Sequence, residues 1–165
     1  MRAGPRVLGR YSLHGAIAAG GMATVHLGRD ATSSRVVAIK RMHAQLALDP
    51  EFVAMFLDEA RLTLAIDHPN VVRTLDVVAD ESELFLVMEY VPGESLARLV
   101  RAERSPPCRV MAAVMTDALL GLHAAHEAKD ARGELLHIVH RDVSPQNILV
   151  GDDGVSRILD FGVAK

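Results

Sequence analysis

The chain has 165 residues, half of them hydrophobic, and its 18 Lys and Arg against 21 Asp and Glu give a formal net charge of -3. This composition excludes a disordered chain and offers no basic field, so we expect no nucleic acid partner. The lone Cys108 cannot form an internal disulfide, which favours the cytoplasm. Residues 11–28 form the longest stretch without Asp, Glu, Lys or Arg, but they include two His and four Gly, so we predict no membrane segment in this chain.

The first half of the chain predicts a small antiparallel sheet with one helix. Short apolar segments, separated by polar or glycine-containing turns, are predicted as strands over residues 11–17, 24–27, 35–41, 71–78 and 84–88. Between the third and fourth of these, Asp49 followed by Pro50 is a helix-start signal. Phe52, Phe56 and Ala60 then recur at helical spacing. We therefore expect five strands and one helix over residues 50–66.

The clearest break in the chain is Pro92-Gly93, and the sequence after it is mainly helical. We predict helices over residues 95–104 and 109–128, an exposed loop over 129–136, and a hairpin whose strands are 148–150 and 155–159. A domain boundary is expected at this break. The predicted domains cover residues 1–91 and 92–165, and the predicted class is α+β.

Two motifs in the second half of the chain fit phosphoryl transfer. Residues 140–147 are His-Arg-Asp-Val-Ser-Pro-Gln-Asn, and Asp160-Phe161-Gly162 begins thirteen residues after Asn147. The reaction needs a carboxylate to accept the proton of the attacking hydroxyl, and oxygen ligands to hold magnesium against the phosphates. Asp142 is the candidate base, and the hairpin would bring the candidate magnesium ligands Asn147 and Asp160 together. Each tripeptide alone could occur by chance or simply end a strand, but their combination favours catalysis.

Lys40 ends the apolar strand segment Val37-Ala38-Ile39, and Glu59 follows nineteen residues later. Glu59 shares a helical face with Phe56, so we expect it to point toward the sheet and to pair with Lys40. Such a pair would direct the ammonium group at the phosphates of ATP. The alternative is a solvated lysine at a strand end and an exposed helix glutamate, which the downstream motifs make less favoured.

With these motifs in this order, the chain resembles bacterial eukaryotic-type serine/threonine protein kinases over essentially its whole length. The resemblance implies a kinase-like fold, with a five-stranded small lobe and an incomplete, mainly helical large lobe. It also implies phosphorylation of protein serine or threonine in signalling, with ATP and Mg2+ as cofactors. Lys40, Glu59, Asp142 and Ser144 would be catalytic, and the nucleotide-binding set would be Ile17, Ala18, Gly20, Gly21, Val25, Ala38, Lys40, Met88, Glu89, Val91, Glu94, Asn147, Leu149 and Asp160.

The sequence departs from the family pattern at the glycine-rich loop, residues 17–25, and at the catalytic loop, residues 140–147. Ala18 and Ala23 replace the outer two glycines and lose access to a left-handed backbone. Ser144 stands where serine/threonine kinases usually have a lysine beside the transferring phosphate. Loss of that cation could cost about 3 kcal/mol of transition-state stabilisation. The alternative function is therefore a nucleotide-binding pseudokinase or a regulatory fragment without phosphotransfer.

Two further expectations concern the second half of the chain. Only three residues follow Gly162, so the activation segment and the later large-lobe helices of the family lie outside the 165 residues. Without them, the helix over 109–128 would expose an apolar face suited to self-association. Separately, two H-x-x-H pairs resemble a zinc site, but no cysteine supports it and we prefer structural roles for these histidines. The four residues are His123, His126, His137 and His140.

Overall fold

The computed structural model describes residues 6–80, 83–102 and 106–161. The chain divides into two compact units, which we call unit 1 (Met1–Ala60 with Thr74–Tyr90) and unit 2 (Arg61–Arg73 with Val91–Lys165). The chain passes from one unit to the other three times, and the third crossing, after Tyr90, falls beside the expected boundary. The segment 61–73 belongs to unit 2, however, whereas the sequence-based division kept it in the first domain; the lobe limits of 1–91 and 92–165 stay a prediction.

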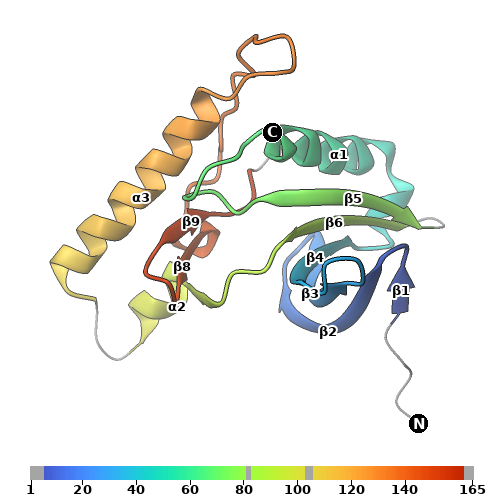
Figure 1. The fold of residues 1–165 in the computed structure, drawn as a ribbon, viewed down its shortest axis with the longest axis horizontal. Helices are drawn as coiled ribbons and strands as arrows, with labels where there is room; N and C mark the ends of the chain where they lie inside the picture. Colours follow the sequence, from blue (N-terminus) through green and yellow to red (C-terminus); the bar gives the residue numbers. More distant parts are fainter. Residues whose placement is uncertain (1–5, 81–82, 103–105, 162–165) are drawn as a thin grey trace. The chain divides into compact units, whose positions relative to one another are not determined.

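Unit 1 is built on a curled sheet of six antiparallel strands in the order β1-β2-β3-β4-β6-β5 (Figure 1). The prediction of five strands was therefore one short. The missed strand, β1, has only three residues, too few for a hydrophobic pattern, and it reverses into β2 through Gly9, whose φ is 55°. The strands are β1 (Arg6–Leu8), β2 (Tyr11–Ala19), β3 (Ala23–Asp30), β4 (Val36–Met42), β5 (Thr74–Asp80) and β6 (Glu83–Glu89).

The helix α1 (Pro50–Leu64) begins where the sequence predicted. Asp49 caps it, because its Oδ1 accepts a hydrogen bond of 2.9 Å from the backbone nitrogen of Glu51. The helix ends two residues before the predicted Ile66, and the last turn continues with tighter backbone hydrogen bonds from Ala65 to Leu62 and from Ile66 to Thr63.

One hydrophobic cluster forms the core of the unit 1 sheet. The alternation of side chains along β4 brings Val37 and Ile39 into this cluster. Gly28 of β3 makes room for Ile39, since a Cβ there would lie 2.4 Å from the Ile39 Cδ1 atom. The buried members are Leu8, Tyr11, Leu13, Val37, Ile39, Phe85 and Val87.

Unit 2 contains a three-stranded antiparallel sheet and two helices. The predicted hairpin is present as β8 and β9, and a short strand that the sequence analysis missed, β7, pairs with β8. Val71 and Val72 were predicted to open a strand of the first sheet. Instead, Val71 forms a parallel bridge with Ile158 of β9, and the Val72 nitrogen donates a hydrogen bond to the Ile158 carbonyl. The elements are β7 (Gly93–Ser95), α2 (Leu96–Arg101), α3 (Cys108–His126), β8 (Ile148–Gly151) and β9 (Ser156–Ile158).

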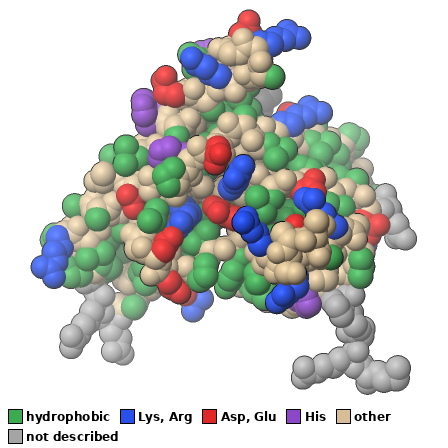
Figure 2. All heavy atoms as spheres, in the orientation of Figure 1, with side chains coloured by type: hydrophobic (Ala, Val, Ile, Leu, Met, Phe, Trp, Pro, Cys, Tyr) green, Lys and Arg blue, Asp and Glu red, His purple; other side chains and the backbone are tan. Residues whose placement is uncertain are grey.

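The helix α3 is the main element of the unit 2 core. Its buried residues Val114, Ala118, Gly121 and Ala125 follow a helical repeat and form one face. By length and composition α3 could also cross a membrane, but core helices of soluble proteins pass the same test. The other side of α3 exposes large apolar side chains. On the face of the molecule drawn in Figure 2, hydrophobic side chains are interspersed with charged side chains of both signs. The exposed apolar residues of α3 are Val110, Met115, Leu119 and Leu120.

The predicted loop over residues 129–136 is organised around one aspartate. Asp130 Oδ1 accepts hydrogen bonds from the backbone nitrogens of Arg132 and Glu134, at 2.8 and 2.9 Å. Gly133 has a φ of 83°, which suits glycine, and its nitrogen bonds to the Asp130 carbonyl. The segment is therefore an exposed but ordered turn that returns the chain to the catalytic loop.

Candidate active site

In unit 1, the predicted pair of Lys40 and Glu59 is an ion pair. Lys40 Nζ lies 2.8 Å from Glu59 Oε1, and each side chain is 13% exposed. Lys40 is fixed by the pairing of β4 with β3 and β6, and Glu59 by the helix α1. The ammonium group is thus held between two regular elements and largely shielded from water, which keeps it in a defined position.

Four of the residues predicted to contact the nucleotide lie on one face of the unit 1 sheet. Val25 of β3 pairs directly with Lys40 of β4, and Ala38 of β4 pairs directly with Met88 of β6. Residues that pair directly point to the same face, as do residues two apart on one strand such as Ala38 and Lys40. Glu89, at the end of β6, pairs with Val37 and is half-buried.

The glycine-rich segment forms a tight connection between β2 and β3. Ala18 pairs with Val25, and the nitrogen of Gly20 donates a 2.9 Å hydrogen bond to the carbonyl of Ala23. Ile17, Gly20 and Gly21 are exposed, as a phosphate-covering loop requires. Left-handed φ values occur at eight described residues, and all lie outside residues 17–23. The alanines that replace the outer two glycines therefore introduce no backbone strain in this conformation.

In unit 2, Asp142 and Asn147 are in direct contact. Asn147 Nδ2 donates hydrogen bonds to Asp142 Oδ2 at 2.8 Å and to the Asp142 carbonyl at 3.0 Å. A short 3-10 helix, η2 (Pro145–Asn147), turns the chain so that this contact forms. The half-buried Ser144 begins this turn, and its carbonyl accepts from the Asn147 nitrogen at 2.9 Å. The Asp142 side chain is exposed, so it can reach a substrate hydroxyl.

The catalytic loop is bonded to the strand that leads to Asp160. His140 Nε2 donates a 2.8 Å hydrogen bond to the Leu159 carbonyl, and the Leu159 nitrogen donates to the Asn147 carbonyl at 2.9 Å. The His140 ring packs on Phe161 with a centroid distance of 4.8 Å, and both residues are 2% exposed. Gly162, the last residue of the second motif, lies outside the described residues.

Two residues of this region have a left-handed backbone, Arg141 with a φ of 63° and Asp160 with a φ of 47°. Such values cost energy for residues other than glycine, and they concentrate at functional sites. The contacts of His140 with Leu159 and Phe161 offset this cost, because they fix the backbone on both sides of the two residues. No sequence signal predicted either conformation.

The donor set of unit 2 fits magnesium. Carboxylates and amide oxygens are the protein ligands that this ion takes, and it usually keeps waters and binds phosphates at its other positions. Because Asn147 Nδ2 faces Asp142, the Asn147 Oδ1 atom is directed elsewhere and is the donor left for a cation. Within the described ranges, no group of three or more His, Cys, Asp and Glu side chains is placed to hold a metal by itself.

The remaining predicted site residues of unit 2 lie along β7 and β8. Glu94 pairs with Val150, its Oε1 accepts from the Ser95 nitrogen at 2.9 Å, and its Oε2 lies 3.2 Å from Arg98 Nη1. Leu149 is half-buried on β8, and Val91 is half-buried just before β7. The predicted ribose contact at Glu94 thus comes from a side chain that already has two local partners.

The sequence analysis missed three residues that fix β9 in place. Asp117 Oδ2 accepts a 2.8 Å hydrogen bond from the Ser156 nitrogen, and Asn70 Nδ2 donates a 2.9 Å bond to the Ser156 carbonyl. Gly121 lets the Asn70 backbone approach α3, since a Cβ there would lie 2.4 Å from the Asn70 carbonyl oxygen. Asp117 had a usable signal, because it is the only acidic residue of α3.

Comparison with known proteins agrees with this geometry. A family model described as the protein kinase domain matches residues 11–165. The chain belongs to the protein kinase family. Its fold is that of a kinase: it aligns with the crystal structure of the Mycobacterium tuberculosis PknI kinase domain at a TM-score of 0.79 and 25% identity, covering 100% of this chain and 64% of that one.

Curated relatives of this kinase chain are bacterial protein kinases. It is 40% identical over 165 residues to the tyrosine-protein kinase MasK of Myxococcus xanthus, covering 95% of this chain and 25% of MasK. It is 35% identical over 164 residues to the serine/threonine-protein kinase PrkC of Bacillus subtilis, covering 99% of this chain and 24% of PrkC. The chain thus spans about a quarter of the length of these relatives.

Proposed function

We propose that the protein transfers the γ-phosphoryl group of ATP to serine or threonine hydroxyls of proteins. The observation that supports this most strongly is the contact between Asp142 and Asn147, which joins a candidate base to a candidate magnesium ligand at 2.8 Å. The arrangement occurs in a chain whose curated relatives are kinases. We further propose that the protein acts in signalling and that this part of it lies in the cytoplasm.

Each group has a distinct part in the proposed reaction. Lys40, held by Glu59, would bind ATP phosphates, and the exposed Asp142 would accept the proton of the attacking hydroxyl. Asn147 Oδ1 and the Asp160 carboxylate would hold Mg2+, which supplies charge neutralisation for the phosphates when bound. Val25, Ala38 and Met88 would contact the adenine from the sheet, because they share the face of Lys40.

The preference for serine and threonine rests on the names of relatives, and these do not all agree. Several are named serine/threonine-protein kinases, whereas MasK is named a tyrosine-protein kinase. Phosphoamino-acid analysis of the products therefore belongs in the test. Label in phosphoserine and phosphothreonine is the expected result, and label confined to phosphotyrosine would contradict the proposed specificity.

The test of phosphotransfer uses the natural full-length protein with γ-labelled ATP, magnesium and a mixture of protein substrates. We expect label in protein, and we expect Asp142→Asn to lower the rate about 10²- to 10⁴-fold, since general base catalysis contributes that much. The variant keeps the size of the side chain and an acceptor for Asn147 Nδ2. Label incorporation at the same rate in Asp142→Asn would reject the proposed base.

A second candidate function is nucleotide binding without phosphotransfer, and Ser144 is the observation that favours it. Its side chain provides no positive charge for the transferring phosphate, where related kinases usually have lysine. The alanines of the glycine-rich loop no longer support this alternative, because the turn does not use a left-handed backbone at their positions. If the wild-type protein binds ATP without incorporating label, and the Ser144→Lys variant does incorporate label, the second function is correct.

A further inference from the structure

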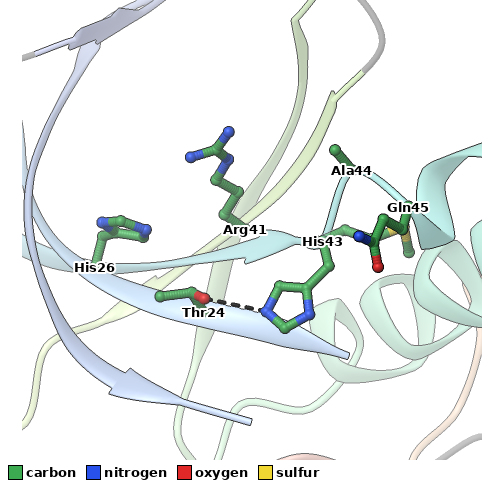
Figure 3. A pocket seen from close by; sticks show the side chains of 7 residues that line it. Thr24, His26, Arg41, His43, Ala44 and Gln45 are labelled. Atoms are coloured by element: carbon green, nitrogen blue, oxygen red, sulfur yellow. Dashed lines mark hydrogen bonds between the residues drawn. The ribbon is translucent and has the colours of Figure 1, made fainter. Parts of the chain in front are cut away.

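Unit 1 contains a pocket of about 410 Å³ that the proposed phosphotransfer does not use. It is lined by the ends of β3 and β4 and by the residues that follow β4, and Figure 3 shows its labelled side chains. Thr24 pairs with Arg41, one position along from the pair of Val25 and Lys40. Since successive residues point to opposite faces of a sheet, the side chains of Thr24 and Arg41 lie on the face opposite Lys40.

The lining of the pocket is rich in hydrogen-bond donors and contains no carboxylate. In Figure 3, Thr24 and Arg41 lie between His26 and His43. Thr24 Oγ1 is 3.1 Å from His43 Nε2. His26 Nδ1 is 3.0 Å from the His14 carbonyl, so Nδ1 is the donor and Nε2 is available to a ligand when the ring is protonated. Gln45 adds an exposed amide at the rim.

The positive charge of Arg41 is already shared, which limits the ligand that the pocket can take. Arg41 Nε bonds to Glu83 Oε1 at 2.8 Å, and its Nη2 bonds to the same oxygen. Burial raises the pKa of the Glu83 carboxyl, but hydrogen bonds from Arg41 and Arg6 outweigh burial and hold the pKa below its usual value. Glu83 is therefore a charged, paired group that keeps Arg41 in place. Among the residues that the structure describes, Arg41 Nη1 has no hydrogen bond, so this nitrogen is the donor left for a ligand.

We propose that this pocket binds a phosphate group, either as inorganic phosphate or as a phosphorylated side chain of a protein. Phosphate offers several acceptor oxygens around one centre, which matches hydroxyl, imidazole, guanidinium and amide donors around one hollow. A metal cation would find no anionic ligand in the lining, and an apolar ligand would leave these donors without partners. The site is separate from the ATP-binding face and does not depend on phosphotransfer activity.

The pocket is bonded to the glycine-rich turn and to the segment that enters α1. The His43 nitrogen donates a 3.0 Å hydrogen bond to the Met22 carbonyl, and the His43 carbonyl accepts from Leu46 at 2.9 Å. A ligand that orders His43 therefore affects Met22 beside Gly21 as well as the buried Met42 in the lining. The methyl groups of these two methionines are suitable reporters of binding.

The experiment uses the natural full-length protein labelled with 13C at the methionine methyl groups. Inorganic phosphate is titrated at about pH 6, where histidine side chains can carry a proton. Sodium chloride at matched ionic strength is the reference, since it reproduces screening without a polydentate anion. We expect saturable shifts of the Met42 and Met22 signals with phosphate, and we expect the double substitution His26→Gln and His43→Gln to weaken binding at least about tenfold.

Two controls make the result decisive. His123→Gln removes an exposed imidazole from α3 in unit 2 and should leave the phosphate affinity unchanged. A phosphothreonine peptide and its unphosphorylated form identify the source of the phosphate: tighter binding of the phosphopeptide than of inorganic phosphate assigns the site to a modified protein, and equal binding assigns it to the free ion. Shifts equal to those with chloride, or unaltered by the double substitution, overturn the proposal.

Discussion

The proposed function uses both Lys40 in unit 1 and Asp142 in unit 2, but different forces position these two side chains. Lys40 is held by a partner nineteen residues away, between a strand paired on both sides and a helix, and it is 13% exposed. Asp142 is exposed, and its partner Asn147 is five residues away in the same loop. The position of Lys40 therefore comes from the packing of the unit, whereas that of Asp142 comes from the local path of the chain.

This difference predicts which substitutions separate stability from activity. Asp142→Asn should lower phosphotransfer about 10²- to 10⁴-fold, and because the side chain is exposed it should change the free energy of unfolding by less than about 0.5 kcal/mol. Glu59→Gln should lower phosphotransfer about 10²-fold through a misplaced ammonium group. It should also destabilise the protein by about 1 kcal/mol, because a charge-assisted hydrogen bond in a shielded position is lost.

Urea unfolding and initial rates with labelled ATP measure both quantities on the same preparations. Glu51→Gln is the matched control, since Glu51 is an exposed glutamate in the first turn of the same helix. It should leave the rate unchanged. If Asp142→Asn unfolds more easily than Glu59→Gln, the contrast between packing in unit 1 and local structure in unit 2 is wrong.

Glycines at close contacts provide a second test of the packing inside each unit. A Cβ at Gly121 would lie 2.4 Å from the carbonyl oxygen of Asn70, which is backbone, whereas one at Gly28 would meet the flexible end of Ile39 at the same distance. We expect Gly121→Ala to destabilise by about 3 kcal/mol and Gly28→Ala by about 1 to 2 kcal/mol, because overpacking costs more where the neighbour cannot move. Chemical denaturation of the two variants measures the difference.

Gly21→Ala is the control for these two substitutions. Its added Cβ meets nothing within 4 Å and its backbone is not left-handed. The substitution therefore adds neither a clash nor backbone strain, and its cost should stay below about 1 kcal/mol. Equal destabilisation by all three variants would mean that these glycines are needed for chain flexibility and not for close contacts.

The sequence predicted those parts of the fold and site that depend on patterns of adjacent residues. The start of α1 at Asp49 and Pro50, the β8–β9 hairpin and the pairing of Lys40 with Glu59 follow from a cap, a turn and a helical face. The first two signals lie within a few residues, whereas the pairing of Lys40 with Glu59 was predicted from the helical face of Glu59 together with the motifs that follow it. The roles of the predicted site residues in catalysis stay predictions.

Features that depend on contacts distant in the sequence could not be predicted. Val71 and Val72 looked like the start of a strand of the first sheet. However, Val71 is the bridge partner of Ile158, and Val72 bonds to the Ile158 carbonyl, eighty-six positions later along the chain. The left-handed backbone at Arg141 and Asp160 is imposed by neighbours that hold the chain on both sides and not by residue type. The strand β1 was too short to show a pattern.

The smallest predicted effect compares two carboxylates that are stabilised by arginine. In unit 2, a hydrogen bond from Arg157 and one from the Val155 nitrogen lower the pKa of Asp153 to about 2. A lowered pKa means that the folded state favours the ionised form, so this stabilisation is present above about pH 4 and is lost as the pH falls toward 2. The melting temperatures of the wild type and Asp153→Asn should therefore differ near neutral pH, begin to converge below about pH 4 and meet near pH 2.

The same measurement on Glu83 in unit 1 completes the comparison. Glu83 joins β6 to Arg41 of β4 and to Arg6 of β1, whereas Asp153 and Arg157 lie four residues apart at one hairpin. Glu83→Gln should lower the melting temperature more than Asp153→Asn at neutral pH, because it removes a link between distant strands from a more buried position. Arg157→Gln should raise the pKa of Asp153, observed by NMR titration, but keep it below 3.8, since the Val155 hydrogen bond remains. A larger loss from Asp153→Asn than from Glu83→Gln would show that local ion pairs matter more than long-range ones in this chain.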